Sequence, residues 1–366
     1  MRVLVVGGTG PSGPHVVGGL LERGHDVTIF HRGAHEPPGL PAVEHVHGDP
    51  HFRESIDEAL QERSFDLVVA MYGRVRHLAP ALAGRCGQFI AVSGVPVYQG
   101  YFPVTGSLPV PVTEEHPVVR AAGDDPGARF SRLLAQAEDA VFSWHPGATV
   151  LRFPMLYGPG NARPHEWSVL RRVRDGRRKM ILPDGGLQVH TRCAAGNAAA
   201  FVLAAADRPH AAAGQVYNCG DPVSWSLRQW AQTIAGLLGA DLDIVPVPRE
   251  IAVSATSTLL PLGGTTADHC VLSTEKARRE LGCAATVDPV DALAEVLAWY
   301  EARPGFDAAA YPAFTDPFDY PMEDALIAEY RSLAGRVTAA VPQGKAAAVH
   351  GMPHPHEPGL ADHRGR

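Results

Sequence analysis

Short apolar runs and stretches of helical period alternate along the first half of the chain. The apolar runs are bounded by turn residues, as buried parallel strands are. They cover Arg2–Val6, Asp26–Phe30, Val43–Val46, Asp66–Ala70, Gln88–Val92 and Thr149–Phe153. Amphipathic stretches between them, at Pro14–Arg23, Glu54–Glu62, Arg76–Gly84 and Arg129–Phe142, have the period of helices. This alternation predicts an α/β fold with a doubly wound parallel sheet of the Rossmann type.

The pattern becomes looser after Phe153. Gly and Pro cluster at Tyr157–Pro164, and shorter helices alternate with brief strands after that. These helices are predicted at Trp167–Arg174, Asn197–Ala206, Ser226–Leu238 and Val290–Arg303. We expect residues 1–155 to form the nucleotide-binding Rossmann domain. Residues 156–334 should form mostly a smaller α/β substrate-binding domain, with segments that return to the Rossmann core, over the carboxyl ends of the strands where open α/β sheets bind ligands.

The last part of the chain changes in composition. A final helix is predicted at Met322–Ala334, and residues 335–366 are rich in Ala, Gly, Pro and His without periodicity. Such a composition buries too little apolar surface to fold, so we expect a disordered tail. Its histidines, His350, His354, His356 and His363, have two carboxylates among them and no predicted scaffold, so no metal site is predicted.

A glycine-rich turn follows the first predicted strand and opens the first predicted helix. Gly7, Gly10 and Gly13 have the spacing G-x-x-G-x-x-G. The first glycine permits a tight turn, the second lets the backbone approach a pyrophosphate, and the third lets helix and strand pack closely. The helix N-terminus supplies N–H groups and a positive dipole end. In this βαβ context the turn predicts a dinucleotide site.

The end of the second strand indicates which dinucleotide binds. An NAD enzyme would carry an acidic residue there for the ribose hydroxyls, but this chain has His31 and Arg32. The planar cation of Arg32 suits a 2′-phosphate, so we expect NADP(H) in preference to NAD(H). Asp49, after the third strand, could accept a hydrogen bond from the adenine amino group. The expected cofactor contacts are Gly7, Thr9, Gly10, Pro11, Ser12, Gly13, His31, Arg32, Asp49, Ala70 and Pro154.

Composition and charge exclude other classes of protein. The formal net charge is −7 and no basic run stands out, so nucleic-acid binding is not expected. No apolar run approaches the roughly 18–20 residues of a membrane span, and no signal peptide is recognised. The five cysteines are scattered without a C-x-x-C pair, which favours reduced thiols and a cytoplasmic location.

Three separated motifs resemble the extended short-chain dehydrogenases/reductases, the NAD(P)-dependent epimerase/dehydratases. Besides the glycine turn they are Arg152-Phe153-Pro154-Met155-Leu156-Tyr157-Gly158-Pro159-Gly160, similar to R-P-x-x-x-Y-G-P-G, and Gly214-Gln215-Val216-Tyr217-Asn218-Cys219-Gly220, similar to G-x-x-Y-N-x-G. The resemblance runs from Met1 to about residue 300. It implies a nicotinamide-dependent enzyme acting on a small molecule, with neither nucleic acid nor membrane as partner, and a homodimer in which the helix at Arg129–Phe142 takes part.

The resemblance fails at the catalytic residues. Members that transfer hydride use Ser or Thr together with a Tyr and a Lys four residues apart, which share one helix face. Here the hydroxyl position falls on Gly94, and the Tyr and Lys positions are Phe130 and Leu134. The chain has only three lysines, Lys179, Lys276 and Lys345, and none has a Tyr four residues before it. The standard dyad is therefore absent in any register.

Several other residues are candidates for the missing proton donor, because each follows a strand or lies at the domain junction. They are Tyr98, Tyr72, Ser93, Tyr157 and His77. A nearby arginine can lower the pKa of a tyrosine and make it a usable acid. Packing is the competing interpretation for each of them.

The resemblance also implies a substrate-binding region near His190. The family's phosphate-binding arginine position is His190 here, with Arg192 two residues later, so a nucleotide-sugar substrate is not supported. Arg163, Arg171 and Arg172 flank the expected cleft and could bind an anion. The predicted substrate contacts are His190, Arg192 and Arg163.

Three functions are compatible with these residues. The first is NADP(H)-dependent reduction or oxidation of a small alcohol, ketone or imine, with a non-standard residue handling the proton. The second is a non-redox lyase, isomerase or cyclase on the same fold. The third is a binding module that senses NADP(H) without turnover.

Overall fold

The computed structural model describes residues 1–34, 36–37, 39–71, 73–102, 108–120, 125–256, 269–283, 285–311, 314–341, 344 and 357–361. The chain divides into two compact units, Met1–Asp319 and Tyr320–Arg366. The domain boundary predicted near residue 155 falls inside the first unit, so the Rossmann and substrate-binding regions are compact together.

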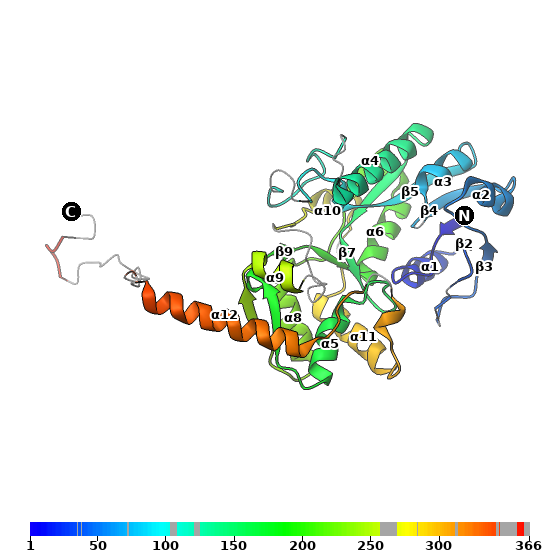
Figure 1. Ribbon diagram of the computed structural model, residues 1–366. Helices are drawn as coiled ribbons and strands as arrows, with labels where there is room; N and C mark the ends of the chain where they lie inside the picture. The colour runs from blue at the N-terminus through cyan, green and yellow to red at the C-terminus, as the bar shows by residue number, and fades with distance from the viewer. Residues whose placement is uncertain are drawn as a thin grey trace. The chain divides into compact units, whose positions relative to one another are not determined.

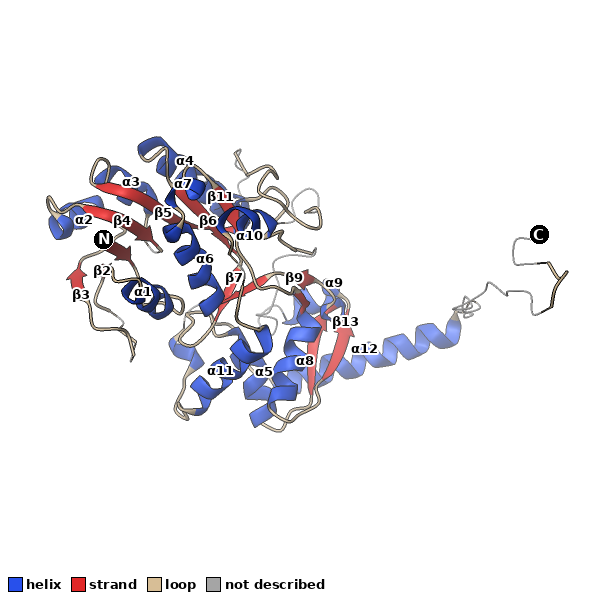
Figure 2. Ribbon diagram, turned by 180° about the vertical axis from the view of Figure 1, so that it is seen from behind, coloured by secondary structure: helices blue, strands red, loops and turns tan. Residues whose placement is uncertain are grey.

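A seven-stranded parallel sheet forms the centre of the first unit (Figure 2). Its strands are β1 (Arg2–Val6), β2 (Asp26–His31), β3 (Glu44–His47), β4 (Phe65–Ala70), β5 (Cys86–Gly94), β6 (Thr149–Phe153) and β11 (Val216–Asn218). They lie in the order β11-β6-β5-β4-β1-β2-β3, and every pairing is parallel. The order reverses between β1 and β4, which is where a doubly wound sheet opens a crevice for ligands.

Helices cover both faces of the sheet (Figure 1). One face packs against α1 (Gly13–Glu22) and α6 (Ala195–Asp207), and the other against α2 (Arg53–Leu60), α3 (Val75–Ala81) and α4 (Pro126–Trp144). The first two helices approach closely, because a Cβ added to Gly19 would lie 2.4 Å from Cδ1 of Leu203. The sheet is thus sandwiched between apolar layers, and its strand ends remain available for a ligand site.

Three two-stranded pairs and six helices make up most of the rest of the first unit. The strand pairs are β7 (Met155–Tyr157) with β10 (Arg192–Ala194), β8 (Lys179–Pro183) with β13 (Asp243–Val247), and β9 (Val189–His190) with β12 (Trp225–Ser226). The helices are α5 (His165–Arg174), α7 (Pro209–Ala212), α8 (Leu227–Leu237), α9 (Arg249–Thr256), α10 (Glu275–Leu281) and α11 (Pro289–Glu301). A capping box of Ser226 and Gln229 fixes the start of α8.

The predicted fold class is confirmed, and one boundary was wrong. The last helix, α12, runs over Tyr320–Ala340, so residues 335–340 are helical although they were expected to lie in the disordered tail. These residues, GRVTAA, include weak helix formers, but adding residues to an existing helix is easier than starting one, so the helix continues through them. None of the helices among the described residues combines the length and hydrophobicity that a membrane crossing requires.

Candidate functional site

The glycine turn has the geometry that its spacing predicts. Gly7 has a φ of 100°, and its N–H donates to the carbonyl of Phe30, which ties the turn to β2. A Cβ on Gly13 would lie 2.0 Å from the carbonyl oxygen of Gly8, so only glycine lets α1 start this close to the turn. A Cβ on Gly10 would meet no atom within 4 Å, so this backbone faces open space. The turn therefore forms a cradle that fits a pyrophosphate.

A groove of about 380 Å³ opens above this turn. It is lined by Gly7, Gly8, Thr9, Gly10, Pro11, Ser12, His31, Arg32, Ala34, Met71, Leu156, Gly160 and Ala162. Seven of the predicted cofactor contacts are thus brought together, from Gly7 through Ser12 to Arg32. Arg32 is exposed at the end of β2, where it can meet a 2′-phosphate.

Four predicted cofactor contacts lie outside the lining of the groove. Gly13 supports the turn from behind, and Ala70 is fully buried in β4. Asp49 Oδ1 accepts hydrogen bonds from the backbone N–H and Nδ1 of His51, so that oxygen is already used. Pro154 precedes the wall that Leu156 provides. The sequence did not predict the wall formed by Leu156, Gly160 and Ala162, although the last two lie in the Gly and Pro cluster at 157–164.

Ser93 and Tyr98 belong to one hydrogen-bonded network, in which Tyr98 is buried and Ser93 is half-buried. Ser93 Oγ donates to Oε1 of Glu138 (2.7 Å), which Arg152 also grips through two hydrogen bonds of 3.0 and 2.6 Å. The Arg152 guanidinium lies 4.7 Å from the Tyr98 ring centroid, and the Tyr98 hydroxyl donates to Asn218 at 2.7 Å. Burial raises the pKa of Tyr98 to about 12. The geometry gives both residues a structural role and argues against the predicted catalytic one.

Tyr157 is also engaged. Its hydroxyl donates to Oδ2 of Asp221 at 2.8 Å, while Oδ1 of Asp221 accepts from the N–H of Ala194 and from Asn197. Burial, and then the charge of Asp221, raise the pKa of Tyr157 far above its usual value. Tyr157 therefore fastens β7 to the segment after β11 and is poorly suited to proton transfer near neutral pH.

The remaining two candidates for proton transfer gain no support. His77, in α3, has an Nε2 that accepts from Nε of Arg76 at 3.4 Å, while its buried Nδ1 has no hydrogen-bond partner within the described part of the chain. Tyr72 lies outside the described residues.

The positions of the missing dyad line a second hollow, of about 590 Å³, between β5 and α4. Phe130 and Leu134 of α4 form part of its wall, with Ser93 at the end of β5. Phe130 is 48% exposed, so a tyrosine there would have room for its hydroxyl. At these positions Phe130 and Leu134 offer this hollow neither a phenol nor an amine.

On the substrate side, two charged residues are buried close enough to influence each other. Glu166 is 0% exposed and Arg192 is 6% exposed, and neither forms an ion pair within the described structure. Burial raises the pKa of Glu166 to about 7 and lowers that of Arg192 to about 10, and each charge opposes the shift of the other. Arg192 also lies 4.9 Å from the ring centroid of Trp230. The sequence predicted Arg192 as a substrate contact because it lies near His190, but no sequence feature indicated Glu166.

The other predicted substrate contacts differ in charge and exposure. Burial, and then the charge of Arg192, lower the pKa of His190 to about 4, so that its imidazole is neutral at physiological pH. Arg163 is exposed, one residue after Ala162 in the wall of the cofactor groove. Arg163 is therefore an exposed cation beside the groove, whereas Arg192 is a buried one.

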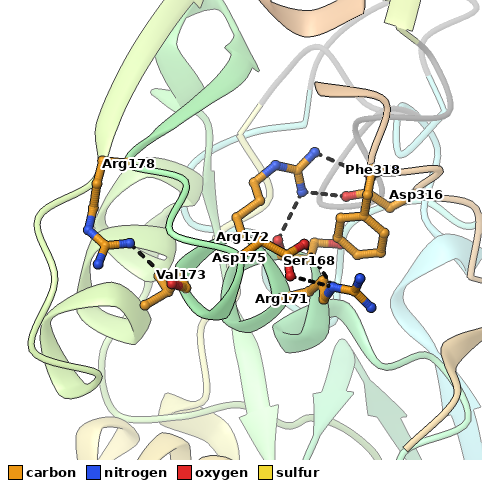
Figure 3. Close-up of polar contacts among 8 residues, drawn as sticks. All are labelled: Ser168, Arg171, Arg172, Val173, Asp175, Arg178, Asp316 and Phe318. Atoms are coloured by element: carbon orange, nitrogen blue, oxygen red, sulfur yellow. Dashed lines mark hydrogen bonds and ion pairs between the residues drawn. The ribbon is translucent and has the colours of Figure 1, made fainter. Parts of the chain in front are cut away.

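Arg172 does not serve as the anion-binding residue that its position suggested (Figure 3). Its guanidinium is buried in a two-bond ion pair with Asp316, at 2.6 and 3.2 Å, and also donates to the carbonyl of Ser168. The Phe318 ring centroid lies 5.3 Å from the guanidinium carbon. Arg171 pairs with Asp175 on the surface of the same helix. Arg172 therefore ties α5 to the segment near Asp316, whereas Arg171 pairs with a residue at the end of its own helix.

A glycine turn that opens α1, at the crevice of a parallel sheet with this strand order, defines a dinucleotide-binding protein of the Rossmann class. Comparison with known proteins agrees. Residues 3–82 match the model of the NAD dependent epimerase/dehydratase family.

Two curated relatives are similar in sequence. A 3-diazoavenalumate denitrifying reductase from Streptomyces sp is 28% identical over 282 residues, which are 71% of this chain and 87% of that protein. The chloroplast stem-loop binding protein of 41 kDa b from Arabidopsis thaliana is 28% identical over 204 residues, 51% of this chain and half of that protein's length.

Solved structures share the fold. UDP-glucose 4-epimerase from Bifidobacterium longum, in complex with NAD⁺ and UDP, is 19% identical with a TM-score of 0.63, over 84% of this chain and all of that one. UDP-glucuronic acid 4-epimerase from Bacillus cereus, in complex with NAD, is 16% identical with a TM-score of 0.62, over 82% of this chain and 99% of that one. The predicted resemblance is confirmed, and these matches support an NAD(P)-dependent enzyme.

Proposed function

We propose that the chain is an NADP(H)-dependent reductase of a small organic molecule, and that its reaction needs no tyrosine–lysine proton donor. One contrast supports this proposal. The groove over the glycine turn keeps its cradle and Arg32, whereas Phe130 and Leu134 replace the acid and its lysine in the neighbouring hollow. A protein that retains the first and lacks the second can orient a hydride donor without supplying a proton.

The preference for NADP(H) is supported by the end of β2. His31 and Arg32 occupy the end of β2, where an NAD enzyme would carry an acidic residue, and the exposed guanidinium of Arg32 lines the groove. A charge-assisted contact of this kind contributes about 1.5–3 kcal/mol, or roughly 10- to 150-fold in affinity.

The substrate class follows from the missing acid. Bound NADPH supplies a hydride, and most ketones also need a proton on the oxygen that becomes an alcohol. An arenediazonium ion does not: hydride forms a C–H bond, the C–N bond breaks, and its electron pair leaves with N₂. The name of the Streptomyces relative, a denitrifying reductase of a diazo compound, supports this choice.

The chain's own residues would orient the reactants. The turn at Gly7–Gly13 and the N-terminus of α1 hold the pyrophosphate, and Arg32 holds the 2′-phosphate. Arg192 and Arg163 offer positive charge to an anionic group of the substrate, such as a carboxylate. We further propose that the chain forms a homodimer through α4, which sedimentation measures. We also propose a cytoplasmic location, which cell fractionation measures.

The first experiment is a titration with NADPH and with NADH, followed by binding heat. The Arg32→Ala variant should weaken NADPH binding about 10- to 150-fold and leave NADH binding nearly unchanged. Arg53→Ala removes an exposed arginine of α2 and is the matched control. Equal losses for the two cofactors, or none, would refute the role of Arg32.

Turnover is tested with a carboxylated arenediazonium ion and NADPH deuterated at the transferred position. Enzyme-dependent appearance of deuterium at the ring carbon, with release of N₂, is expected above the rate without enzyme. Binding of NADPH without reduction of this acceptor or of activated ketones would favour a sensing function instead.

A further inference from the structure

Three histidines and a glutamate converge at the outer edge of the cofactor groove. His31 is the last residue of β2, and His45 and His47 alternate along β3, so that both point to the same side of the sheet. The parallel pairing of these strands places His31 opposite His47. Glu36, from the turn after β2, meets all three. None of these residues is used by the function proposed above, except that His31 also lines the groove.

The carboxylate of Glu36 lies at long distances from the three imidazole nitrogens. Oε1 of Glu36 lies 3.5 Å from Nε2 of His31, 3.4 Å from Nδ1 of His45 and 3.4 Å from Nε2 of His47. Nε2 of His31 lies 3.0 Å from Nδ1 of His45, and all four atoms lie within 4.8 Å of one another. Hydrogen bonds from imidazole to a carboxylate are usually about 2.7–2.9 Å.

Four of the six separations between ligand atoms, at 3.0–3.5 Å, are close to those of a tetrahedral metal site. Around an ion with bonds of about 2.0–2.1 Å, neighbouring ligand atoms are separated by about 3.3 Å. Three imidazole nitrogens and one carboxylate oxygen are ligands that Zn²⁺ and the divalent ions of similar softness accept. We propose that His31, Glu36, His45 and His47 bind a single divalent transition-metal ion of the zinc type.

The proposed site is open on one side and closed on the other. The side chains of His47 and Glu36 are 59% and 46% exposed, whereas that of His31 is 4% exposed. An ion can therefore enter from solvent and reach the buried imidazole last. Because Glu36 and His47 lie at the surface, replacing either of them should leave the fold intact.

A metal ion here would act on the cofactor groove. The backbone N–H of Gly33 donates to Nδ1 of His31 at 3.1 Å. Metal ligation through Nε2 leaves the proton of a neutral imidazole on Nδ1, so the Gly33 contact must open. Gly33 lies between Arg32 and Ala34, and both of these line the groove. Metal and NADPH binding are therefore coupled, and this part of the inference rests on the proposed cofactor.

The test uses the full chain with its four tail histidines replaced by glutamine, so that they do not contribute. Zn²⁺ is titrated by calorimetry, and Co²⁺ is used to read the coordination geometry by visible absorption. Glu36→Gln and His47→Gln are the test variants, and His210→Gln, at an exposed position in α7, is the control.

One equivalent of Zn²⁺ and the strong visible bands of four-coordinate Co²⁺ are expected. Each test variant should weaken binding at least about tenfold, and His210→Gln should not. Zn²⁺ should change the Kd for NADPH, and Glu36→Gln should abolish that change. Equal Zn²⁺ affinity in all variants, or weak six-coordinate Co²⁺ bands, would overturn the site. Metal binding in a protein that does not bind NADPH would reject the proposed function and leave the metal site standing.

Discussion

The buried ion pair between Arg172 and Asp316 allows a quantitative test of the structure. Their side chains are 1% and 0% exposed, and the closest contact is 2.6 Å. Asp316→Asn keeps the shape of the side chain but removes the carboxylate charge that pairs with the buried Arg172 guanidinium. Breaking a buried pair in this way costs about 3–5 kcal/mol.

This loss converts into a measurable shift in melting temperature. The first unit ends at Asp319, and unfolding entropy is roughly 2.1 cal/mol/K per residue, or about 0.7 kcal/mol/K for the unit. The Tm should therefore fall by about 4–8 °C. Urea denaturation should show a lower midpoint with an unchanged slope.

A surface pair provides the control. Arg53 and Asp57 are also 2.6 Å apart, but both side chains are 46% exposed. Asp57→Asn should cost at most about 1 kcal/mol, because solvent screens an exposed pair. If Asp316→Asn lowered the free energy of unfolding by no more than Asp57→Asn does, burial would not strengthen the Arg172–Asp316 ion pair. That result would refute the reasoning.

Three further predictions concern the sites. Gly13→Ala places a Cβ 2.0 Å from a backbone oxygen of its own turn and should weaken NADPH binding at least about tenfold by calorimetry, whereas Gly18→Ala, which meets no atom within 4 Å, should not. Burial raises the pKa of Glu166 from 4.5 to about 7, so the folded protein binds this proton more tightly than the unfolded chain does. The free energy of unfolding should therefore fall by about 3 kcal/mol as the pH rises from 4.5 to 7. Urea denaturation at several pH values measures this fall, and Glu166→Gln should remove it. Phe130→Tyr combined with Leu134→Lys should increase NADPH-dependent ketone reduction, at the lower end of the about 10²–10⁴-fold that a positioned acid contributes; an unchanged rate would show that this hollow does not face the nicotinamide.

The sequence predicted those features that depend on local chemistry. β6 begins and ends at the predicted residues because its five residues form one buried run, and the glycine turn is recognisable because its three glycines lie within seven residues. No residue ranges were predicted for the brief strands after residue 156. Two of them, β9 and β12, have only two residues each and are defined by their pairing alone.

The candidate site shows the same limit. Ser93 and Tyr98 looked free in the sequence, but their partners Glu138 and Asn218 are 45 and 120 residues away. Only the folded sheet brings those atoms together. A sequence pattern therefore identifies residues with suitable chemistry and does not reveal whether another residue already occupies them.

The histidine cluster illustrates this limit most directly. The histidine-rich segment of the sequence is the tail. His45 and His47, two residues apart, look in the sequence like ordinary strand residues. His31 joins them because β2 and β3 pair in parallel. The alternation of side chains along a strand is thus the signal that would have found half of the cluster.

The two outer strands of the central sheet limit how copies of this chain can associate. β3 has four residues and β11 has three, so each border offers few backbone N–H and C=O groups to a strand from another molecule. The first residue of β3 is Glu44, whose charge further discourages such pairing. Continuing the sheet across two molecules would gain only a few hydrogen bonds. Self-association should instead use helix surfaces, and exposure of the sheet borders should not make the folded protein prone to fibrous aggregation.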